Sequence, residues 1–462
     1  MVDVNKEFKS LRLSPEVLSN LESLGYLQMT PIQAQSLPFI LDNKDLIGQA
    51  NTGSGKTAAF GLGILSKLDT SNPQPQALVL CPTRELAEQV CVELRRLARF
   101  TNNIKILSLC GGTKERHKAR SLEHGAHIIV GTPGRIKQLL EKKTLNVRFL
   151  KILVLDEADR MLEMGFINEI NHIASFTPID RQTLLFSATF PNGIKTLSAS
   201  LQEDAKQVTV DSQHEENRIN QLFFKVEDDE SKLPALLLLL GHFKPKSAII
   251  FCKSKDTCTK LTHLLRKQKI SALEIHAELE QQDRTLVLVK FANKSCCVLV
   301  ATDVAARGLD INDVAAVINY DLPSDHELYV HRIGRTGRIG KEGLSLSLYT
   351  KKENSRLEEI AKYLKKPCVS MELDSLKKNK SLQLNPLMST IYISGGKKDN
   401  MRPGDILGAL TKDAGLKGKD VGNIQIFDVN SYVAIAVDQV DIAVERLNAG
   451  KIKGRRFRVG KA

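Results

Sequence analysis

Short apolar runs, separated by longer stretches of helical pattern, fill most of this chain of 462 residues. One set of runs comprises residues 44–50, 77–83, 106–112, 127–133, 151–159 and 183–189, and a second set comprises 247–254, 272–279, 296–303, 315–321 and 343–350. Apolar runs of this length between helices are typical of parallel sheets that are covered on both faces. We therefore predict an α/β fold with two parallel-sheet domains in tandem, whose ligands bind at the carboxyl ends of the strands.

The spacing of apolar residues changes near the end of the chain. The pattern there predicts a strand at 390–396, a helix at 403–415, a hairpin at 423–437, a helix at 440–450 and a last strand at 455–461. The first of these helices has Pro near its start and Gly at its end, as helices often do. The order βαββαβ predicts a small α+β domain.

Polar stretches at 211–220 and 374–386 separate these three parts. We predict a first domain at 1–208, a linker at 209–218, a second domain at 219–370, a linker at 371–385 and a tail domain at 386–462.

The composition restricts the partners and the compartment. The formal net charge of +13 indicates a polyanionic partner such as nucleic acid, although a merely soluble basic protein would show it too. The eight cysteines include no C-x-x-C pair, which argues against zinc and disulfides and favours a reducing cytoplasm. The first ten residues lack the apolar core of a signal peptide. The apolar run at 233–240 is too short to span a bilayer and predicts a buried helix.

A Gly-rich stretch, "ANTGSGKT", lies between a predicted strand and a predicted helix. Backbone N–H groups of such a turn at a helix N-terminus hold phosphate, the lysine adds a charge for the β- and γ-phosphates, and the threonine hydroxyl binds Mg²⁺. An ordinary strand–loop–helix turn is the alternative. The predicted nucleotide-binding residues here are Ala50, Asn51, Thr52, Gly53, Ser54, Gly55, Lys56 and Thr57.

Two carboxylates follow the predicted strand at 151–155. Asp156 can reach the metal, partly through water, and Glu157 can act as the general base for the attacking water. A carboxylate pair after a strand is often only a helix N-terminus satisfying its dipole. Together with the phosphate loop, one reaction explains both residues, and this reaction is the Mg²⁺-dependent hydrolysis of a nucleoside triphosphate.

The motif "DEAD" at 156–159, combined with the phosphate loop, resembles the DEAD-box RNA helicases. The resemblance implies two RecA-like domains and ATP as the nucleotide. The segment 25–33 resembles the Q motif of this family (predicted here to span residues 6–34), with Phe8 upstream at the usual spacing. It implies that Gln33 reads the adenine edge and that Phe8 stacks on the ring.

Further motifs of that family occur in order along the chain: "PTRELA" at 82–87, Gly111-Gly112, "TPGR" at 132–135 and "SAT" at 187–189 in the first segment, and "QQDR" at 281–284 in the second. The resemblance implies that the RNA backbone is bound by Pro82, Thr83, Arg84, Gly112, Thr132, Pro133, Gly134, Arg135, Gln281, Arg284 and Thr302. It implies a role in coupling hydrolysis to strand separation for Asp159, Ser187, Thr189 and His331.

The second segment also carries "ATDVAARGLD" at 301–310 and "HRIGRTGR" at 331–338. Arg335 and Arg338, one helical turn apart, can bind phosphate oxygens together. The resemblance implies that both reach the γ-phosphate from across a cleft and that Asp310 holds the ribose. Because neither segment has both the phosphate loop and the arginines, ATP and RNA should raise each other's affinity by drawing the segments together.

The tail resembles an RNA recognition motif, a fold that stacks bases on aromatic side chains of its central strands. Tyr392 and Tyr432 fit this pattern, whereas Ala434 and Val437 replace expected aromatics. The basic residues Lys451, Lys453, Arg455, Arg456 and Arg458 offer phosphate contacts instead, unless they form only a solvated strand edge.

The tail is most similar to that of the bacterial DbpA-type helicases, and more loosely to the DeaD type. The resemblance implies local unwinding of a 23S ribosomal RNA hairpin in pre-50S particles. We expect a cytoplasmic protein that acts as a monomer, since nothing in the sequence demands more than one chain. An ATP-gated RNA clamp and a general RNA chaperone of the DeaD type are alternatives, and a translocating DNA helicase is a third.

Overall fold

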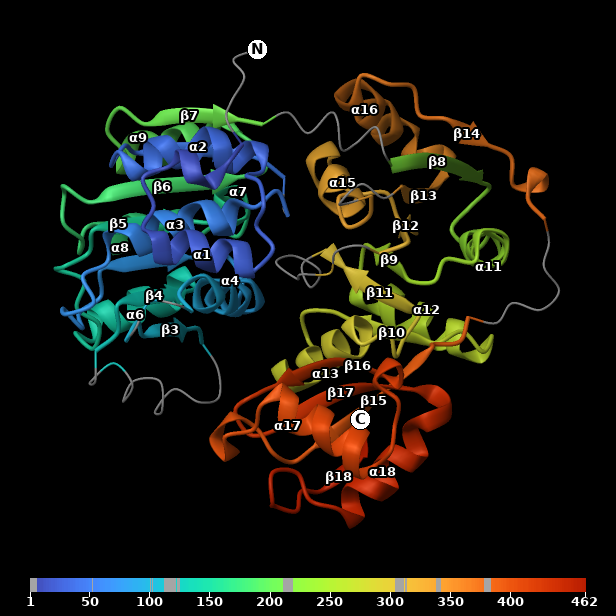
Figure 1. Cartoon of the computed structure of the whole chain (residues 1–462). Helices are drawn as coiled ribbons and strands as arrows, with labels where there is room; N and C mark the ends of the chain where they lie inside the picture. The colour runs from blue at the N-terminus through green and yellow to red at the C-terminus, as the bar shows by residue number, and fades with distance from the viewer. Residues whose placement is uncertain are drawn as a thin grey trace. The chain divides into compact units, whose positions relative to one another are not determined.

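The computed structural model describes residues 6–51, 53–99, 101, 103–111, 122, 125–210, 219–303, 311, 314–337, 342–377 and 384–462. The described residues form two compact units, one ending at residue 210 and one beginning at residue 219 (Figure 1). Within this part of the chain, no helix combines the length and the apolar character that crossing a membrane requires.

The first unit is built on a seven-stranded sheet with the order β3-β4-β2-β5-β6-β1-β7, in which every pairing is parallel. Its strands are β1 (Leu46–Gln49), β2 (Ala77–Leu80), β3 (Ile106–Leu109), β4 (Ile128–Gly131), β5 (Ile152–Leu155), β6 (Gln182–Ser187) and β7 (Lys206–Thr209). The prediction of a parallel sheet from the apolar runs is confirmed, and only β7 was not among the predicted strands.

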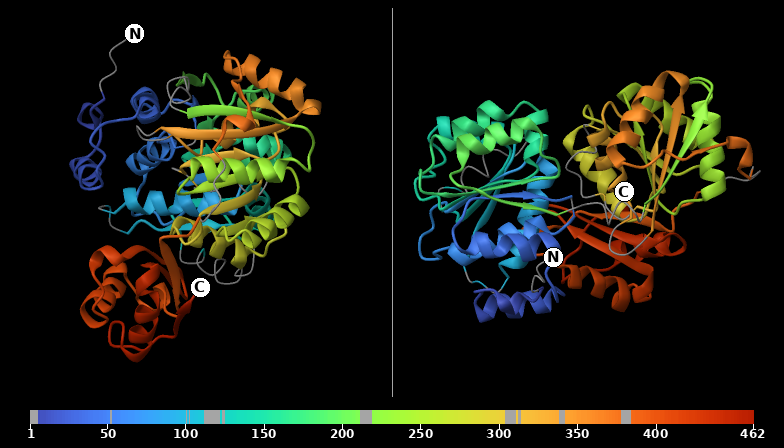
Figure 2. Two further views of the ribbon diagram at one scale, coloured as in Figure 1. Left: turned by 90° about the vertical axis from the view of Figure 1, so that its right-hand side faces the viewer. Right: turned by 90° about the horizontal axis from the view of Figure 1, so that it is seen from above.

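Helices cover both faces of this sheet, as the right-hand view of Figure 2 shows. They are α1 (Pro15–Ser23), α2 (Pro31–Leu41), α3 (Lys56–Lys67), α4 (Arg84–Leu97), α6 (Pro133–Glu141), α7 (Ala158–Glu163), α8 (Ile167–Ala174) and α9 (Asn192–Leu201), preceded by the 3-10 turn η1 (Phe8–Ser10). Alternate residues of one strand therefore enter different cores. In β5, Ile152 and Val154 pack with α2, α3 and α4, whereas Leu153 and Leu155 pack with α6, α7, α8 and α9.

The second unit contains a second seven-stranded parallel sheet with the order β10-β11-β9-β12-β13-β8-β14. Its strands are β8 (Ile219–Val226), β9 (Ala248–Cys252), β10 (Ala272–Ile275), β11 (Val298–Thr302), β12 (Ala316–Asn319), β13 (Gly343–Thr350) and β14 (Ser370–Met371). Its helical elements are α11 (Lys232–Phe243), α12 (Lys255–Lys267), α13 (Gln281–Ala292), α15 (His326–Ile333), the 3-10 turn η2 (Lys351–Glu353) and α16 (Asn354–Leu364). The buried helix predicted at 233–240 is confirmed as α11.

The tail in the same unit is a four-stranded antiparallel sheet with the order β16-β17-β15-β18. Its elements are β15 (Met388–Ile393), α17 (Pro403–Gly408), β16 (Val421–Ile426), β17 (Ser431–Ala436), α18 (Val440–Ala449) and β18 (Val459–Lys461). Figure 1 shows α17 and α18 on one side of this sheet, where they pack against Ile391, Val433 and Ile435. The predicted order βαββαβ is confirmed.

The last strand is shorter than predicted. It begins at Val459, because the preceding basic residues form a tight turn between Ile452 and Arg455. The backbone of Lys453 (φ 52°) and Gly454 (φ 77°) is left-handed at this turn. Lys451, Lys453, Arg455 and Arg456 therefore lie outside the sheet, whereas the backbone oxygen of Arg458 accepts from the N–H of Ser394, just after β15, at 2.9 Å.

Candidate nucleotide and RNA site

The Gly-rich stretch forms a turn between β1 and α3, as its sequence predicts. Gly53 (φ 86°) and Gly55 (φ 98°) adopt left-handed backbone conformations, which glycine reaches without strain. Lys56 is buried, and its Nζ donates to the backbone oxygen of Ala50 at 2.8 Å. Among the described residues, the buried Oγ of Ser54 finds no hydrogen-bond partner. Phosphate or another anion fits this turn, because the turn offers the Ser54 hydroxyl, the Lys56 ammonium group and the N-terminus of α3. Asn51 lies in the same turn, Thr57 is the second residue of α3, and Thr52 lies outside the described residues.

The Q-motif segment is held against this turn. Gln33 is 1% exposed, its Nε2 donates to the backbone oxygen of Gly55 at 3.1 Å, and its Oε1 accepts from the N–H of Thr30 at 2.9 Å. Phe8 is buried and packs edge-to-face with Tyr26, with ring centroids 6.3 Å apart. The structure thus brings the base-selecting segment and the phosphate turn together, and the adenine contacts of Gln33 and Phe8 stay predictions.

The two carboxylates that the sequence predicts to be catalytic lie directly after β5. Asp156 is 3% exposed, and its Oδ1 accepts from the N–H of Glu157 at 3.0 Å. Burial raises the pKa of Asp156 to about 6, although the charge of Lys56 opposes this shift. Glu157 is buried and has a left-handed backbone (φ 52°, ψ 52°), a conformation that costs free energy for a residue with a side chain. Burial and backbone strain at adjacent carboxylates are typical of a functional site.

The residues of the first unit that are predicted to couple hydrolysis to strand separation also contact one another. Oδ2 of Asp159 accepts from the N–H of Ala188 at 3.1 Å, and from the N–H and the hydroxyl of Thr189 at 2.9 and 3.0 Å. Ser187 is fully buried beside them. The end of the "DEAD" motif is therefore hydrogen-bonded to the "SAT" loop.

The predicted RNA-binding residues of the first unit follow neighbouring strands. Thr83 caps α4 by accepting from the N–H of Leu86 at 3.3 Å, and Thr132 precedes α6 at the end of the adjacent strand β4. A side chain at Gly111 would place its Cβ 3.2 Å from the guanidinium of Arg84. Pro82 lies in the loop before α4, and Pro133, Gly134 and Arg135 form the first turn of α6. All of them share the carboxyl edge of one sheet, and Gly112 lies outside the described residues.

The second unit places its predicted residues at the corresponding edge of its own sheet. Gln281 and Arg284 lie in the first turn of α13, and Thr302 ends β11. Arg335 follows α15 and is buried, and its backbone oxygen accepts from the N–H of Val314 at 3.2 Å. His331 lies in α15 itself. Asp310 and Arg338 lie outside the described residues.

Sequence reasoning missed Arg332 and Asp303 in this region. The guanidinium of Arg332 binds the Asp303 carboxylate in a bidentate pair, with distances of 2.6 Å (Nε to Oδ1) and 2.7 Å (Nη2 to Oδ2). Its Nη1 donates to Oδ1 of Asn319 at 3.0 Å and to the backbone oxygen of Asp321 at 2.7 Å. Asp303 belongs to the stretch 301–310 and Arg332 to the stretch 331–338, so this pair joins two motifs that the sequence showed only separately.

The tail sheet exposes aromatic side chains on the face opposite its helices. Tyr392 and Tyr432 are directly paired across β15 and β17, with ring centroids 5.7 Å apart. Phe427 lies 5.7 Å from Tyr432 and was missed, because it follows β16 rather than lying within it. Ala434 is buried, and its strand partner Thr390 hydrogen-bonds Ser295 of the second sheet domain at 2.7 Å. The small side chain of Ala434 fits here, because this end of the sheet face is covered by the second sheet domain.

The structure changes two interpretations of the tail that were based on its sequence. Val437 does not replace an aromatic of the sheet, because β17 ends at Ala436 and Val437 is 48% exposed in the following turn. Lys453 is exposed, but its Nζ donates to the backbone oxygen of Asn400 at 2.8 Å and lies 3.6 Å from Asp405. Its charge is thus partly engaged within the tail. The other predicted basic residues, Lys451, Arg455, Arg456 and Arg458, are exposed.

Family models and relatives agree with this geometry. The DEAD/DEAH box helicase model matches residues 30–197, the helicase conserved C-terminal domain 231–340, and the DbpA RNA binding domain 390–461. The ATP-dependent RNA helicase DbpA of Escherichia coli (strain K12) is 49% identical over 448 residues, which cover 97% of each chain. DbpA of Bacillus subtilis (strain 168) is 37% identical over 476 residues, covering 98% of this chain and 99% of that protein.

Solved structures give the same result for the two sheet domains. S. cerevisiae Dbp5 bound to RNA and ADP BeF3 matches with a TM-score of 0.73 and 33% identity, covering 80% of this chain and 96% of that chain. Both parallel-sheet domains are therefore RecA-like, and the tail is a DbpA-type RNA-binding domain. The chain belongs to the DbpA family of DEAD-box ATP-dependent RNA helicases, which are RNA-dependent ATPases.

Proposed function

We propose that this helicase locally unwinds 23S ribosomal RNA, at a hairpin near the peptidyl-transferase centre, during assembly of the large ribosomal subunit. The observation that carries the proposal is the tail, which matches the DbpA RNA binding domain over 390–461 and exposes the Tyr392–Tyr432 pair. Base stacking on aromatic side chains contributes about 1–3 kcal/mol per base. The tail binds the ribosomal hairpin, and the RecA-like domains act on RNA next to it. The enzyme works as a cytoplasmic monomer on pre-50S particles.

We assign the catalytic roles from the family motifs, and the geometry of Lys56 and Glu157 in the first unit supports the roles of these two residues. The turn containing Lys56 binds the β- and γ-phosphates, and Glu157 takes a proton from the attacking water. Arg335 and Arg338 stabilise the charge that develops on the γ-phosphate, and Asp310 binds the ribose. Because these groups come from two units, hydrolysis requires the units to close on ATP and RNA together.

Mg²⁺ fits the residues at this site. Asp156 is a buried carboxylate whose pKa burial raises to about 6, so a cation that arrives with the nucleotide offsets the free-energy cost of its charge. Oxygen ligands are those that Mg²⁺ prefers, and few protein ligands are needed when phosphates complete the shell. Thr57 and Asp156 would hold the ion, partly through water. When bound, Mg²⁺ neutralises charge on the phosphate oxygens.

RNA-stimulated ATPase activity tests the substrate. We compare the full chain with a chain truncated after residue 380, using 23S fragments that contain the hairpin and random RNA of equal length. The full chain should be stimulated at least tenfold more strongly by the hairpin fragments, and the truncated chain equally by both. Equal stimulation of the full chain by both RNAs would contradict the ribosomal target and favour a general chaperone of the DeaD type.

A further inference from the structure

A buried lysine begins α11 in the second unit. Lys232 is 2% exposed, and its Nζ lies 2.9 Å from Oδ1 of Asp321 and 3.0 Å from Oδ1 of Asp229. Oε2 of Glu353 lies 3.4 Å away. These carboxylates come from the turn before α11, the end of β12 and the end of η2. Burial lowers the pKa of Lys232, but Asp321 and the other carboxylates outweigh burial, so its pKa ends above its usual range. Lys232 is therefore a cation at neutral pH.

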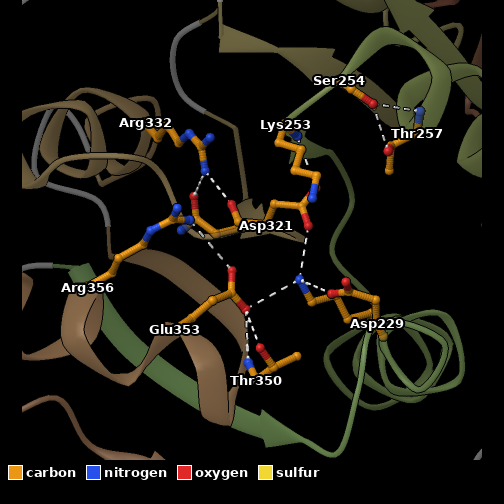
Figure 3. A network of polar contacts seen from close by, with 11 residues as sticks. Asp229, Lys253, Ser254, Thr257, Asp321, Arg332, Thr350, Glu353 and Arg356 are labelled. Carbon is orange, nitrogen blue, oxygen red and sulfur yellow. Dashed lines mark hydrogen bonds and ion pairs between the residues drawn. The ribbon is translucent and has the colours of Figure 1, made fainter.

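The partners of Lys232 bind the backbone at the ends of other strands (Figure 3). Oδ2 of Asp321 accepts from the N–H of Lys253, just after β9, at 3.0 Å. Oε2 of Glu353 accepts from the N–H and the hydroxyl of Thr350, at the end of β13, at 2.9 and 3.1 Å. The lysine thus fixes the carboxyl ends of β9, β12 and β13 relative to one another.

From Asp321 the contacts continue into the arginine motif. The backbone oxygen of Asp321 accepts from Nη1 of Arg332 at 2.7 Å, and Arg332 binds Asp303 in the bidentate pair described above. The backbone oxygen of Arg332 in turn accepts from the N–H of Arg335 at 3.2 Å. A continuous chain of contacts therefore runs from Lys232 through Asp321 and Arg332 to the backbone of Arg335.

Loss of the lysine would leave two poorly exposed carboxylates facing each other. The side chains of Asp321 and Glu353 are only 9% and 14% exposed, and both lie against the Lys232 charge, while Glu353 also has the guanidinium of Arg356 at 4.0 Å. An uncompensated buried carboxylate moves towards water or takes up a proton. A displacement of Asp321 also displaces the carbonyl that Arg332 binds, and with it the segment that carries Arg335.

We propose that Lys232 is a positioning residue for hydrolysis, which sets the location of Arg335 through Asp321 and Arg332. The inference rests on the proposed role of Arg335 at the γ-phosphate. It predicts a defect in turnover rather than in nucleotide affinity, because the phosphate turn lies in the other unit.

Four variants test the proposal in the full chain: Lys232→Met, Lys232→Met with Asp321→Asn, Lys67→Met and Arg335→Gln. RNA-stimulated kcat, the KM for ATP, the Kd of a fluorescent ADP analogue and the Tm are measured, with kinetics well below every Tm. Lys232→Met should lower kcat at least tenfold and leave the ADP affinity within twofold of wild type. The added Asp321→Asn removes one of the two carboxylate charges left facing each other and should restore at least a third of the lost kcat. Lys67→Met removes another partly buried lysine, which belongs to the other unit and binds Gln182 there, and should lower the Tm without changing kcat.

Each of these measurements can either support or overturn the positioning role of Lys232. Wild-type kcat for Lys232→Met, or no recovery in the double variant, would overturn the proposal and leave Lys232 with a purely structural role. Should Lys232→Met fail to fold, Asp321→Asn alone carries the test. A kcat at least threefold below wild type with unchanged ADP affinity supports the proposal, and a wild-type kcat contradicts it. Wild-type kcat for Arg335→Gln would instead disprove the proposed role of Arg335, whatever the Lys232 variants show.

Discussion

The side-chain amide of Gln33 donates a hydrogen bond to the backbone oxygen of Gly55, 3.1 Å away in the phosphate turn. The same side chain accepts from the N–H of Thr30 at the start of α2. Through this one residue, the segment expected to select the base is part of the loop expected to bind the phosphates. A change in either one should alter the binding of the whole nucleotide.

Gly55→Ala should abolish ATP binding while leaving the fold intact. The added Cβ would lie 2.5 Å from Nε2 of Gln33, and the left-handed backbone (φ 98°) adds strain on the order of 1 kcal/mol. We expect the Kd of an ATP analogue to rise more than tenfold, as measured by fluorescence titration. Gly165→Ala is the matched control, because Gly165 has a similar φ of 78° with no atom within 4 Å of its Cβ position. Equal ATP affinity in both variants would contradict the contact.

Glu157→Gln should bind ATP and RNA but hydrolyse ATP at least a hundredfold more slowly, because general base catalysis contributes about 10²–10⁴ in rate. Single-turnover phosphate release in saturating RNA measures the effect. Glu163→Gln, at the end of the following helix, should keep wild-type turnover. Phosphate release at the wild-type rate by Glu157→Gln would show that this carboxylate is not the base.

Asp156→Asn should stabilise the ligand-free protein at pH 7.5. Burial raises the pKa of Asp156 to about 6, whereas an unfolded aspartate titrates near 3.9, so the folded state holds the extra proton between these values. Stability therefore falls as pH rises through that window. The substitution should raise the free energy of unfolding by about 2–3 kcal/mol at pH 7.5 and by about half as much at pH 5.0.

Thermal unfolding at both pH values measures this gain. Asp204→Asn, which replaces an exposed carboxylate paired with Lys206, should give no stabilisation at either pH. If Asp156→Asn had the wild-type Tm at pH 7.5, the buried charge of Asp156 would lower the free energy of unfolding only slightly.

Tyr392→Ala and Tyr432→Ala should each weaken the binding of the 23S hairpin by about 1–3 kcal/mol, because each removes a stacking surface. Hairpin affinity is measured by anisotropy at a fixed salt concentration. Val437→Ala should bind as wild type does, because Val437 lies beyond the end of β17. Unchanged affinity in both tyrosine variants would place RNA recognition on another surface of the tail, such as the basic turn.

The sheets were predictable because fully buried parallel strands are uninterrupted apolar runs. All residues of β2, β4 and β5 are buried, and each of these strands was recognised. In contrast, β7 has a single buried apolar residue, Val208, among polar residues, and this strand was missed. In β8, Asn220, Gln221 and Lys225 interrupt the apolar pattern, so this strand was also missed and its start was taken as part of the polar break at 211–220.

The phosphate turn was recognised because its residues form one local motif, whereas Asp159 and Thr189 were recognised only in separate motifs and not as a hydrogen-bonded pair 30 residues apart. The cluster around Lys232 was not recognised, because its carboxylates lie at positions 229, 321 and 353 and only the sheet order brings them together. No local pattern distinguishes such a lysine from one on a solvated helix. Phe427 was missed for a related reason, since its place beside Tyr432 depends on the hairpin geometry.

The central claim is that two units each hold half of one catalytic site, which ATP and RNA complete together. The affinity for single-stranded RNA, measured with and without a nonhydrolysable ATP analogue, tests it most directly. The account predicts that the analogue raises the RNA affinity of the wild type at least tenfold, about 1.4 kcal/mol of coupling, and leaves that of Arg335→Gln nearly unchanged. Equal RNA affinity of the wild type with and without the analogue would contradict it.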